Sequence, residues 1–398
     1  MNNARKSTPS SARLAGLLAL AMGMPMMMFY AIGILGPQII DNLGMPRAHL
    51  GWLITSTFGM AAILSPWAGA LVQYLGTRRG LVGLFLLVGL SFAMIAFLPG
   101  FGGIVVALMF CGAAQSLANP ATNQAIAQIV PIEYKARVVG LKQAGVQASA
   151  LVAGLLLPRL TSLLGWRGAL AVWAPLAVVV TYLAIRWIPK KGSSAAQVSG
   201  FKVERPNRWL RMLMMIQLCA GLTISSFITF VGVYAHQLGM PAQIIGAMVS
   251  GFGVAGISSR LLLTPLGARL RDESILLFLL FVFAVLALLV MRQASYGTYW
   301  PLWVGTLGIG VTVVATNSIA MSMLLREPRF GGIAGSAGTL SSGFFSGFAL
   351  GPPAFGALLA GPRGFCMAWL SLIAVLIVGG LFCLGLHQMR KRREAVAY

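Results

Sequence analysis

Long apolar runs separated by short polar segments dominate this chain. Breaks at charged residues, Gly-Pro pairs and polar clusters leave twelve runs, at about 13–36, 48–72, 80–98, 102–128, 137–160, 168–188, 209–235, 242–266, 274–292, 300–325, 331–358 and 364–387. Most reach the roughly 20 residues that an α-helix needs to cross a bilayer. The pattern predicts an all-α membrane protein with twelve transmembrane helices.

The first run follows Arg5, Lys6 and Arg13, an arrangement that also begins a secretory signal peptide. It is longer than the usual apolar region of a signal peptide, and eleven more runs follow it. We therefore expect an uncleaved transmembrane helix.

Composition supports a membrane protein. Of the 398 residues, 58% are hydrophobic and only 9% are charged, whereas about a quarter are charged in a soluble domain. The four cysteines, Cys111, Cys219, Cys366 and Cys383, all fall in apolar segments without a C-x-x-C spacing, so we expect buried free thiols.

The chain has a net charge of +22, and most of its basic residues lie in the segments between the apolar runs. With the N-terminus inside, 24 of the 29 Lys and Arg residues fall in cytoplasmic segments, and the other 5 are Arg47, Arg159, Arg167, Arg292 and Arg363. Positive residues concentrate on the cytoplasmic side of membrane proteins. The split predicts a multi-pass membrane protein with both termini in the cytoplasm, and no nucleic-acid partner.

Short segments recur at a nearly constant offset, which indicates an internal repeat. Leu-Gly-Met-Pro at 43–46 returns at 238–241, and Ala-Thr-Asn at 121–123 returns at 315–317. The polar stretch 189–208 lies between the repeats. We expect an N-terminal six-helix half at 1–188, a cytoplasmic linker at 189–208 and a C-terminal six-helix half at 209–398, as two parallel repeats.

Two six-helix halves joined by a basic loop resemble the major facilitator superfamily. The loop after the second run resembles the G-x-x-x-D-R-x-G-R-R signature of that family, although Gln73 replaces the aspartate. The matching loop of the second half carries Ala268 where its aspartate would stand. The resemblance implies a gating role for residues on these two loops: Gly69, Gln73, Gly76, Arg78, Arg79 and Arg269. The two aspartates that help to latch the cytoplasmic gate in that family are absent at these positions.

Among the charged residues, Lys142 and Arg260 lie deepest in the apolar runs. No acidic residue lies deep inside a run. The segment Gly-Leu-Lys-Gln-Ala-Gly-Val at 140–146 resembles a K-Q-[AS]-G-V sequence of a poorly characterised bacterial branch of the superfamily, which implies a bacterial inner (plasma) membrane. A cation in hydrocarbon is costly unless it reaches the interface or meets a partner. The alternatives are therefore snorkelling to the cytoplasmic surface or an anion site between the halves.

The resemblance also places the first, fourth, seventh and tenth helices around a central cavity. The expected substrate-binding residues are Lys142, Arg260, Gln115, Gln147, Tyr30, Asn119 and Asn317. Because Asn123 and Asn317 are related by the repeat, a symmetric interhelical hydrogen bond is the competing role for them.

These features favour a secondary active transporter that moves a small organic solute, with an anion preferred, by alternating access. The alternative is a drug or amphiphile exporter of the same superfamily. It is weakened because Leu108 stands where proton-coupled exporters carry arginine and the fifth helix has no Gly-Pro pair.

We expect no enzyme, cofactor or metal, because His49, His236 and His387 lie near helix ends and no catalytic motif is present. The expected partners are a small-molecule substrate and the lipid bilayer, with a monomeric chain and with ion coupling left open.

Overall fold

The computed structural model describes residues 11–130, 132–189, 205–331 and 333–396, which fold almost entirely into α-helices. The first part contains α1 (Ser11–Leu43), η1 (Arg47–His49), α2 (Leu50–Leu75), α3 (Thr77–Phe97), α4 (Gly100–Ile129), α5 (Ile132–Ala171) and α6 (Trp173–Trp187). The second contains α7 (Arg208–Gln237), α8 (Ala242–Arg269), α9 (Glu273–Met291), α10 (Trp300–Val311), α11 (Val313–Arg326), η3 (Pro328–Phe330), α12 (Ile333–Leu359) and α13 (Gly364–Val396).

Eleven helices of the described ranges are long and apolar enough to cross a membrane, with α10 and α11 taken together. The remaining predicted run corresponds to α6, a shorter apolar helix of 15 residues. It is preceded by a kink inside α5, where Gly165 adopts φ 67° and ψ 168°. Val172 between α5 and α6 keeps helical angles, so residues 166–187 continue in one direction after the kink. The predicted all-α membrane fold is confirmed.

The tenth predicted run, 300–325, is interrupted at Thr312. Its angles are φ −93° and ψ −74°, and its Oγ1 donates to the carbonyl of Gly308 at 2.6 Å. A hydroxyl that bonds to the carbonyl four residues earlier competes with the helix ladder and commonly bends a helix. The sequence pattern did not predict this break.

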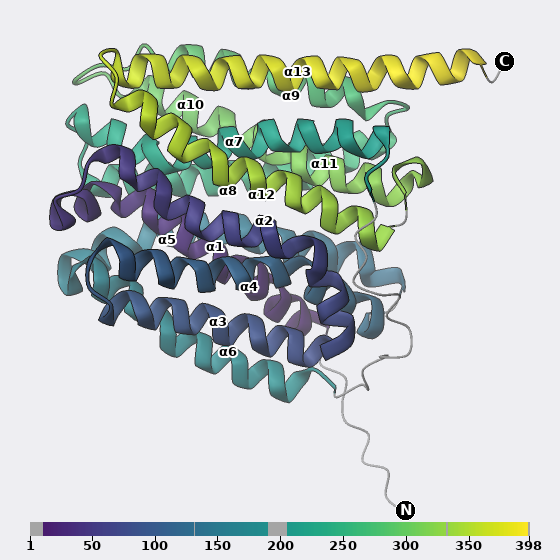
Figure 1. Cartoon of the computed structure of the whole chain (residues 1–398), viewed down its shortest axis with the longest axis horizontal. Helices are drawn as coiled ribbons and strands as arrows, with labels where there is room; N and C mark the ends of the chain where they lie inside the picture. Colours follow the sequence, from purple (N-terminus) through teal and green to yellow (C-terminus); the bar gives the residue numbers. More distant parts are fainter. Residues whose placement is uncertain (1–10, 131, 190–204, 332, 397–398) are drawn as a thin grey trace, which may run out of the picture.

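The helices form two groups that lie side by side (Figure 1). Helices α1–α6 pack mainly on one another, as do α7–α13, and the groups meet where α1, α2 and α5 face α7, α12 and α8. We call the end of the bundle where α1 begins and α13 ends the terminal face, and the other end the opposite face. The boundaries of the two predicted halves stay a prediction, and most of the linker, 190–204, lies outside the described residues.

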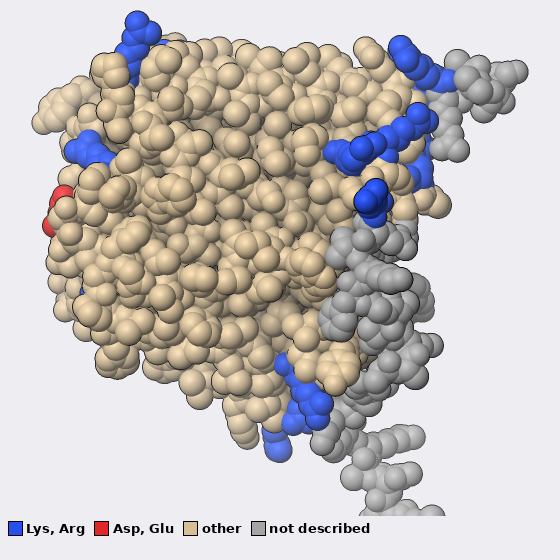
Figure 2. Space-filling view, viewed as in Figure 1, with Lys and Arg blue, Asp and Glu red and all other residues tan. Residues whose placement is uncertain are grey.

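On the face of the bundle in view, charged side chains are absent from the middle. Figure 2 shows a broad band free of Lys, Arg, Asp and Glu, with basic residues at its ends. This distribution suits a membrane protein, because hydrocarbon disfavours unpaired charge.

Aromatic rings fill the contact between the groups. Phe29 of α1 and Phe58 of α2 lie 5.4 Å apart between ring centroids, and both pack against Phe348 of α12, at 5.3 and 4.5 Å. Such pairs add stabilisation beyond area burial. The centre of the interface is therefore apolar near Phe29, one residue before Tyr30.

Candidate functional site

Lys142 on α5 is buried in the bundle, with 1% of its side chain exposed. Its ammonium group donates to three side-chain oxygens of α4: Asn123 Oδ1 at 2.6 Å, Thr122 Oγ1 at 2.9 Å and Asn119 Oδ1 at 3.5 Å. All three acceptors are neutral, and no carboxylate of the described residues pairs with Lys142. The side chain lies against α4, so its positive charge remains inside the protein.

Arg260 on α8 reaches across the contact between the two helix groups. Its Nη1 donates to the backbone carbonyl of Gln143 on α5 at 2.9 Å. Its Nε is buried and has no hydrogen-bond partner within the described residues. Arg260 therefore brings a second cation to α5 and keeps one donor unused.

Tyr30 and Gln147 form a buried pair beside Arg260. The Tyr30 hydroxyl of α1 donates to Gln147 Oε1 of α5 at 3.2 Å, and the side chains are 1% and 2% exposed. A Cβ at Gly256 of α8 would lie only about 2.9–3.0 Å from the Gln147 side chain, so glycine there lets Gln147 approach α8. Because Arg260 follows Gly256 by one helical turn, it shares that face. We call Tyr30, Gln147 and Arg260 the central cluster.

Two other predicted residues lie outside the central cluster. Gln115 on α4 is 4% exposed, and its Oε1 has no partner in the described part of the chain. Asn317 on α11 donates to Gln217 Oε1 of α7 at 3.1 Å, while Gln217 donates to the carbonyl of Thr316 at 3.3 Å. Asn317 is thus engaged within the second helix group.

The structure sorts the predicted substrate residues into separate sets. Arg260, Gln147 and Tyr30 meet in the central cluster, whereas Lys142 and Asn119 form a second set on α4 and α5. The repeat-related Asn123 and Asn317 each make an interhelical bond. Their partners differ, Lys142 for one and Gln217 for the other, so the expected symmetry does not extend to the partners.

The two helix groups are joined closely at the opposite face. Arg47 Nη1 donates to Gln237 Oε1 at 2.8 Å, and a Cβ at Gly154 of α5 would lie 2.1 Å from the carbonyl of Gly246 of α8. Towards the terminal face, α4 and α11 pack chiefly on helices of their own groups. Asn123, which accepts from Lys142, is exposed there. Lys142 is thus covered from the opposite face, while its partner Asn123 is exposed towards the terminal face.

The predicted gating residues lie on two connections at the terminal face. Gly76 ends α2 with φ 83°, a conformation that favours glycine. Gln73, Arg79 and Arg269 are exposed, Gly69 and Arg78 are half-buried, and none of them forms an ion pair with a described residue. The carbonyl of Ala268, which replaces the family's aspartate, accepts a hydrogen bond from Arg326 at 2.8 Å.

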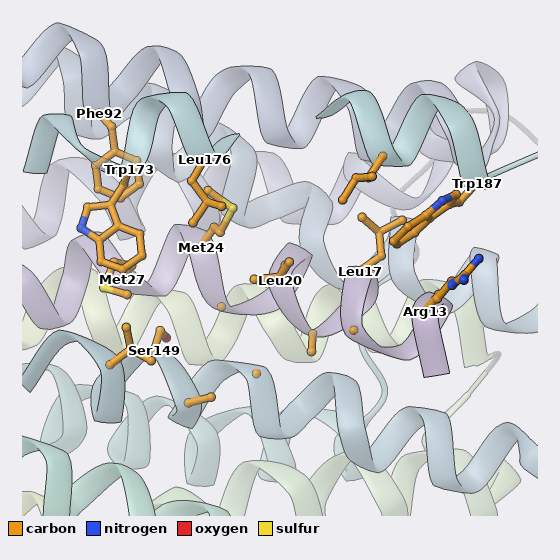
Figure 3. Close-up of a pocket in the computed structure, with 17 residues that line it drawn as sticks. Arg13, Leu17, Leu20, Met24, Met27, Phe92, Ser149, Trp173, Leu176 and Trp187 are labelled. Carbon is orange, nitrogen blue, oxygen red and sulfur yellow. The ribbon is translucent and has the colours of Figure 1, made fainter. Parts of the chain in front are cut away.

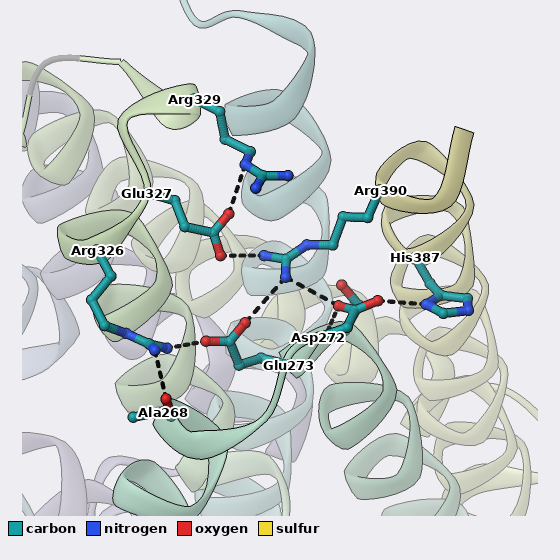
Figure 4. Close-up of polar contacts among 9 residues, drawn as sticks. Ala268, Asp272, Glu273, Arg326, Glu327, Arg329, His387 and Arg390 are labelled. Atoms are coloured by element: carbon teal, nitrogen blue, oxygen red, sulfur yellow. Dashed lines mark hydrogen bonds and ion pairs between the residues drawn. The ribbon is translucent and has the colours of Figure 1, made fainter. Parts of the chain in front are cut away.

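A network of charged residues occupies the terminal face of the second helix group (Figure 4). We call it the charge cluster; it contains Asp272, Glu273, Arg326, Glu327, Arg329, His387 and Arg390. At its centre Arg390, 6% exposed, contacts Asp272 at 3.2 Å, Glu273 at 3.1 Å and Glu327 at 2.5 Å. The cluster ties α13 to the start of α9 and the end of α11.

Asp272 lies in the connection between α8 and α9, outside the apolar spans. Burial alone would raise the pKa of its carboxyl group, but hydrogen bonds from His387 and Ser274 and the charge of Arg390 outweigh burial. The pKa of Asp272 therefore lies below its ordinary value, and the group is ionised at neutral pH.

Sequence reasoning missed the charge cluster and Gln217. Placing His387 near a helix end was not enough to identify its role, because its partner Asp272 is 115 residues away. One signal was present. Asp272 and Glu273 lie at the start of the predicted run 274–292, and Glu327 lies at the end of the run 300–325, on the same predicted side of the membrane.

The model of the Major Facilitator Superfamily matches residues 17–345 of this chain. The chain is 25% identical to the "Uncharacterized transporter YycB" of Bacillus subtilis over 88% of each chain. It is also 25% identical to the "Multidrug resistance protein MdtG" of Escherichia fergusonii over 90% of each. A solved bacterial homologue of the human lysosomal transporter Spinster, in an inward-facing and occupied conformation, has a TM-score of 0.74 at 13% identity, covering 96% of this chain and 98% of that one.

Proposed function

Because this chain belongs to the major facilitator superfamily of transporters, we propose that it carries a small organic anion across a bacterial inner membrane by alternating access. One observation carries the proposal. The described part of the membrane interior holds two cations, Lys142 and Arg260, and both are paired only with neutral oxygens.

The position of the cations supports an anionic substrate. Lys142 belongs to the first proposed half and Arg260 to the second. Lys142 lies on α5, and Arg260 donates a hydrogen bond to the carbonyl of the next α5 residue, Gln143. Arg binds carboxylates through two parallel hydrogen bonds, and the Nε of Arg260 is unused. An anion that bound there would relieve the cost of two uncompensated charges, while a cation would add to it.

Alternating access fits the proposed halves, 1–188 and 209–398 with the linker 189–208 between them. The basic residues gather at the terminal face, so we place that face and both termini in the cytoplasm. The closed opposite face and the exposed Asn123 would then describe an inward-facing state. Substrate would reach Lys142 and the central cluster from the cytoplasm.

A drug or amphiphile exporter is the second candidate. The aromatic contact of Phe29, Phe58 and Phe348 adjoins Tyr30 and would accommodate an apolar ring. The relative named as a multidrug resistance protein supports this candidate. The two candidates differ in the charge that the site should accept.

Uptake into proteoliposomes tests the proposal. Vesicles carrying the purified protein would be incubated with a mixture of organic acids, amines and neutral solutes, and the contents identified by mass spectrometry. We expect acids to accumulate above protein-free vesicles, and Lys142→Gln and Arg260→Gln to remove that accumulation.

Arg211→Gln is the matched control, because Arg211 is exposed at the start of α7 and lies outside the site. Normal acid uptake by both site variants would overturn the anion proposal. Accumulation of amines alone would favour the exporter.

A further inference from the structure

An apolar groove runs along the outer surface of the first helix group. Its volume is about 470 Å³, and its walls come from α1, α3, α5 and α6 (Figure 3). The lining is almost wholly hydrocarbon, with Leu17, Leu20 and Met24 along α1 and Leu176 on α6. The lining includes no residue of α8 and none of the central cluster, so the groove is a separate site.

The two ends of the groove differ in chemistry. Arg13 and Trp187 lie together at the terminal-face end, whereas Trp173 and Met27 lie at the other (Figure 3). From Arg13 to Met27 the groove follows α1 for about 21 Å, at a rise of roughly 1.5 Å per residue. One leaflet contributes about 15 Å of the roughly 30 Å hydrocarbon core. The groove therefore extends from the membrane surface to about the midplane.

Arg13 is an exposed cation at the groove entrance. It lies in the first turn of α1, its side chain is exposed, and it forms no ion pair with any described residue. Trp side chains such as Trp187 prefer the headgroup level of a bilayer. These two residues mark the depth at which a lipid phosphate would lie.

We propose that this groove is a binding site for one anionic phospholipid of the leaflet at the terminal face. One acyl chain lies along α1 between Leu17 and Met27, and the phosphate contacts the guanidinium of Arg13. The shape of the groove and the charge at its entrance together specify this occupant.

The headgroup determines which lipid binds. Lipid tails are as apolar as the Leu and Met side chains of the groove, so the lining gives no preference between one phospholipid and another. Arg13 gives a preference for anionic lipids, because its guanidinium pairs with the phosphate. An anionic headgroup carries no ammonium group that would compete with Arg13 for that phosphate. The basic terminal face raises the local concentration of such lipids.

The bound chain would also support the packing of α1. Gly23 and Gly145 lie in the groove floor, where a Cβ on Gly23 would be 2.6 Å from the Gly145 carbonyl. Helix α1 carries Tyr30 seven residues beyond Gly23. An acyl chain against this contact would hold α1 on α5 from the membrane side.

Native mass spectrometry tests the site with two variants. The protein would be released from vesicles of phosphatidylethanolamine with a minor fraction of phosphatidylglycerol, and the retained lipids counted. Arg13→Gln should lower retained phosphatidylglycerol about five-fold, the factor that corresponds to one basic residue near the surface. Gly16→Leu should fill the groove and lower retention of both lipids; a Cβ there meets open space, so the variant should fold.

Each variant has a matched control. Arg186→Gln removes an exposed charge near the end of α6 outside the groove lining, and Gly83→Leu adds a side chain in open space on α3. Both should retain lipid like the parent protein, and unfolding midpoints confirm folding. Equal losses for Arg13→Gln and Arg186→Gln, or unchanged retention in Gly16→Leu, would overturn the proposal. So would displacement of lipid by an amphiphilic amine with no effect of Arg13→Gln, because the groove would then be a substrate site.

Discussion

Arg260 of α8 and Gln143 of α5 are joined by a hydrogen bond from the guanidinium Nη1 to the main-chain carbonyl, at 2.9 Å. Because the acceptor is backbone, the bond does not depend on the side chain at position 143. It connects the two helix groups next to the central cluster, and it leaves the Nε of Arg260 free for a ligand. The side chain of Arg260, and not that of Gln143, should therefore control transport.

Replacing Arg260 and Gln143 one at a time distinguishes the role of the Arg260 side chain from that of the Gln143 side chain. Arg260→Gln should lower the initial rate of anion uptake in proteoliposomes by about tenfold or more, the effect of losing a hydrogen bond to a charged group. Gln143→Ala should transport at close to the parent rate, because the carbonyl remains. A Gln143→Ala variant as impaired as Arg260→Gln would show that the side chain of Gln143 is needed, which contradicts this reading.

Neutralising Lys142 in place is a second test. Asn123→Asp puts a carboxylate where the 2.6 Å contact with the ammonium now lies, so the lysine would gain an ion-pair partner. We expect anion uptake to fall sharply while the protein stays folded. Asn42→Asp is the control, since it adds the same charge at an exposed position at the end of α1, outside the site. Undiminished uptake by Asn123→Asp would mean that the charge of Lys142 takes no part in transport.

Removing the lysine should cost stability as well as activity. Lys142→Met leaves the oxygens of Asn119, Thr122 and Asn123 without their ammonium donor, and losing a hydrogen bond to a charged group costs about 1.5–3 kcal/mol. The unfolding midpoint measured by intrinsic fluorescence should fall. A midpoint at or above that of the parent would indicate that the buried ammonium destabilises the protein more than its hydrogen bonds stabilise it.

The fold was predictable from sequence, and the site only in part. Twelve apolar runs and the charge asymmetry follow from the solvent properties of the bilayer, which act on each segment separately. The sequence placed Lys142 and Arg260 deepest in the apolar runs, but it left open whether they reach the cytoplasmic surface or stay inside. Their partners were not predictable, because they depend on which faces of α4, α5 and α8 turn towards one another.

Two features depended on several helices at once. The charge cluster needs the start of α9, the end of α11 and a turn of α13 to converge on Arg390. The apolar groove needs four helices to leave a gap, while each of them alone is an ordinary apolar span. The break at Thr312 is local, but threonine is common in unbroken helices, so the residue alone did not mark it.

Arg390 should be essential to the packing of α13. Arg390→Gln would leave Asp272, Glu273 and Glu327 without their shared cation, and breaking a buried ion pair costs about 3–5 kcal/mol. We expect a clear drop in the unfolding midpoint. Arg392→Gln, at an exposed position two residues later, should leave the midpoint unchanged; equal effects of the two would argue against a structural role for the cluster.

The lowered pKa of Asp272 predicts an acid-dependent loss of stability. A carboxylate whose folded-state pKa is below the ordinary value of 3.8 stabilises the fold above that value, and the contribution is lost as pH falls through the folded-state pKa. Asp272→Asn should therefore have a lower unfolding midpoint than the parent at neutral pH. The difference should shrink as pH falls below about 4. A difference that stays constant across this range would contradict the ion pairing of Asp272.

The central claim is that the site selects negative charge, and ligand-induced thermal stabilisation measures this most directly. Benzoate, benzyl alcohol and benzylammonium have similar size and shape and differ mainly in charge. A ligand that binds the folded state raises the unfolding midpoint in proportion to the logarithm of its concentration over its Kd. We predict that benzoate raises the midpoint, that the other two do not, and that Arg260→Gln removes the effect. Preferential stabilisation by benzylammonium, or equal shifts with all three compounds, would contradict the account.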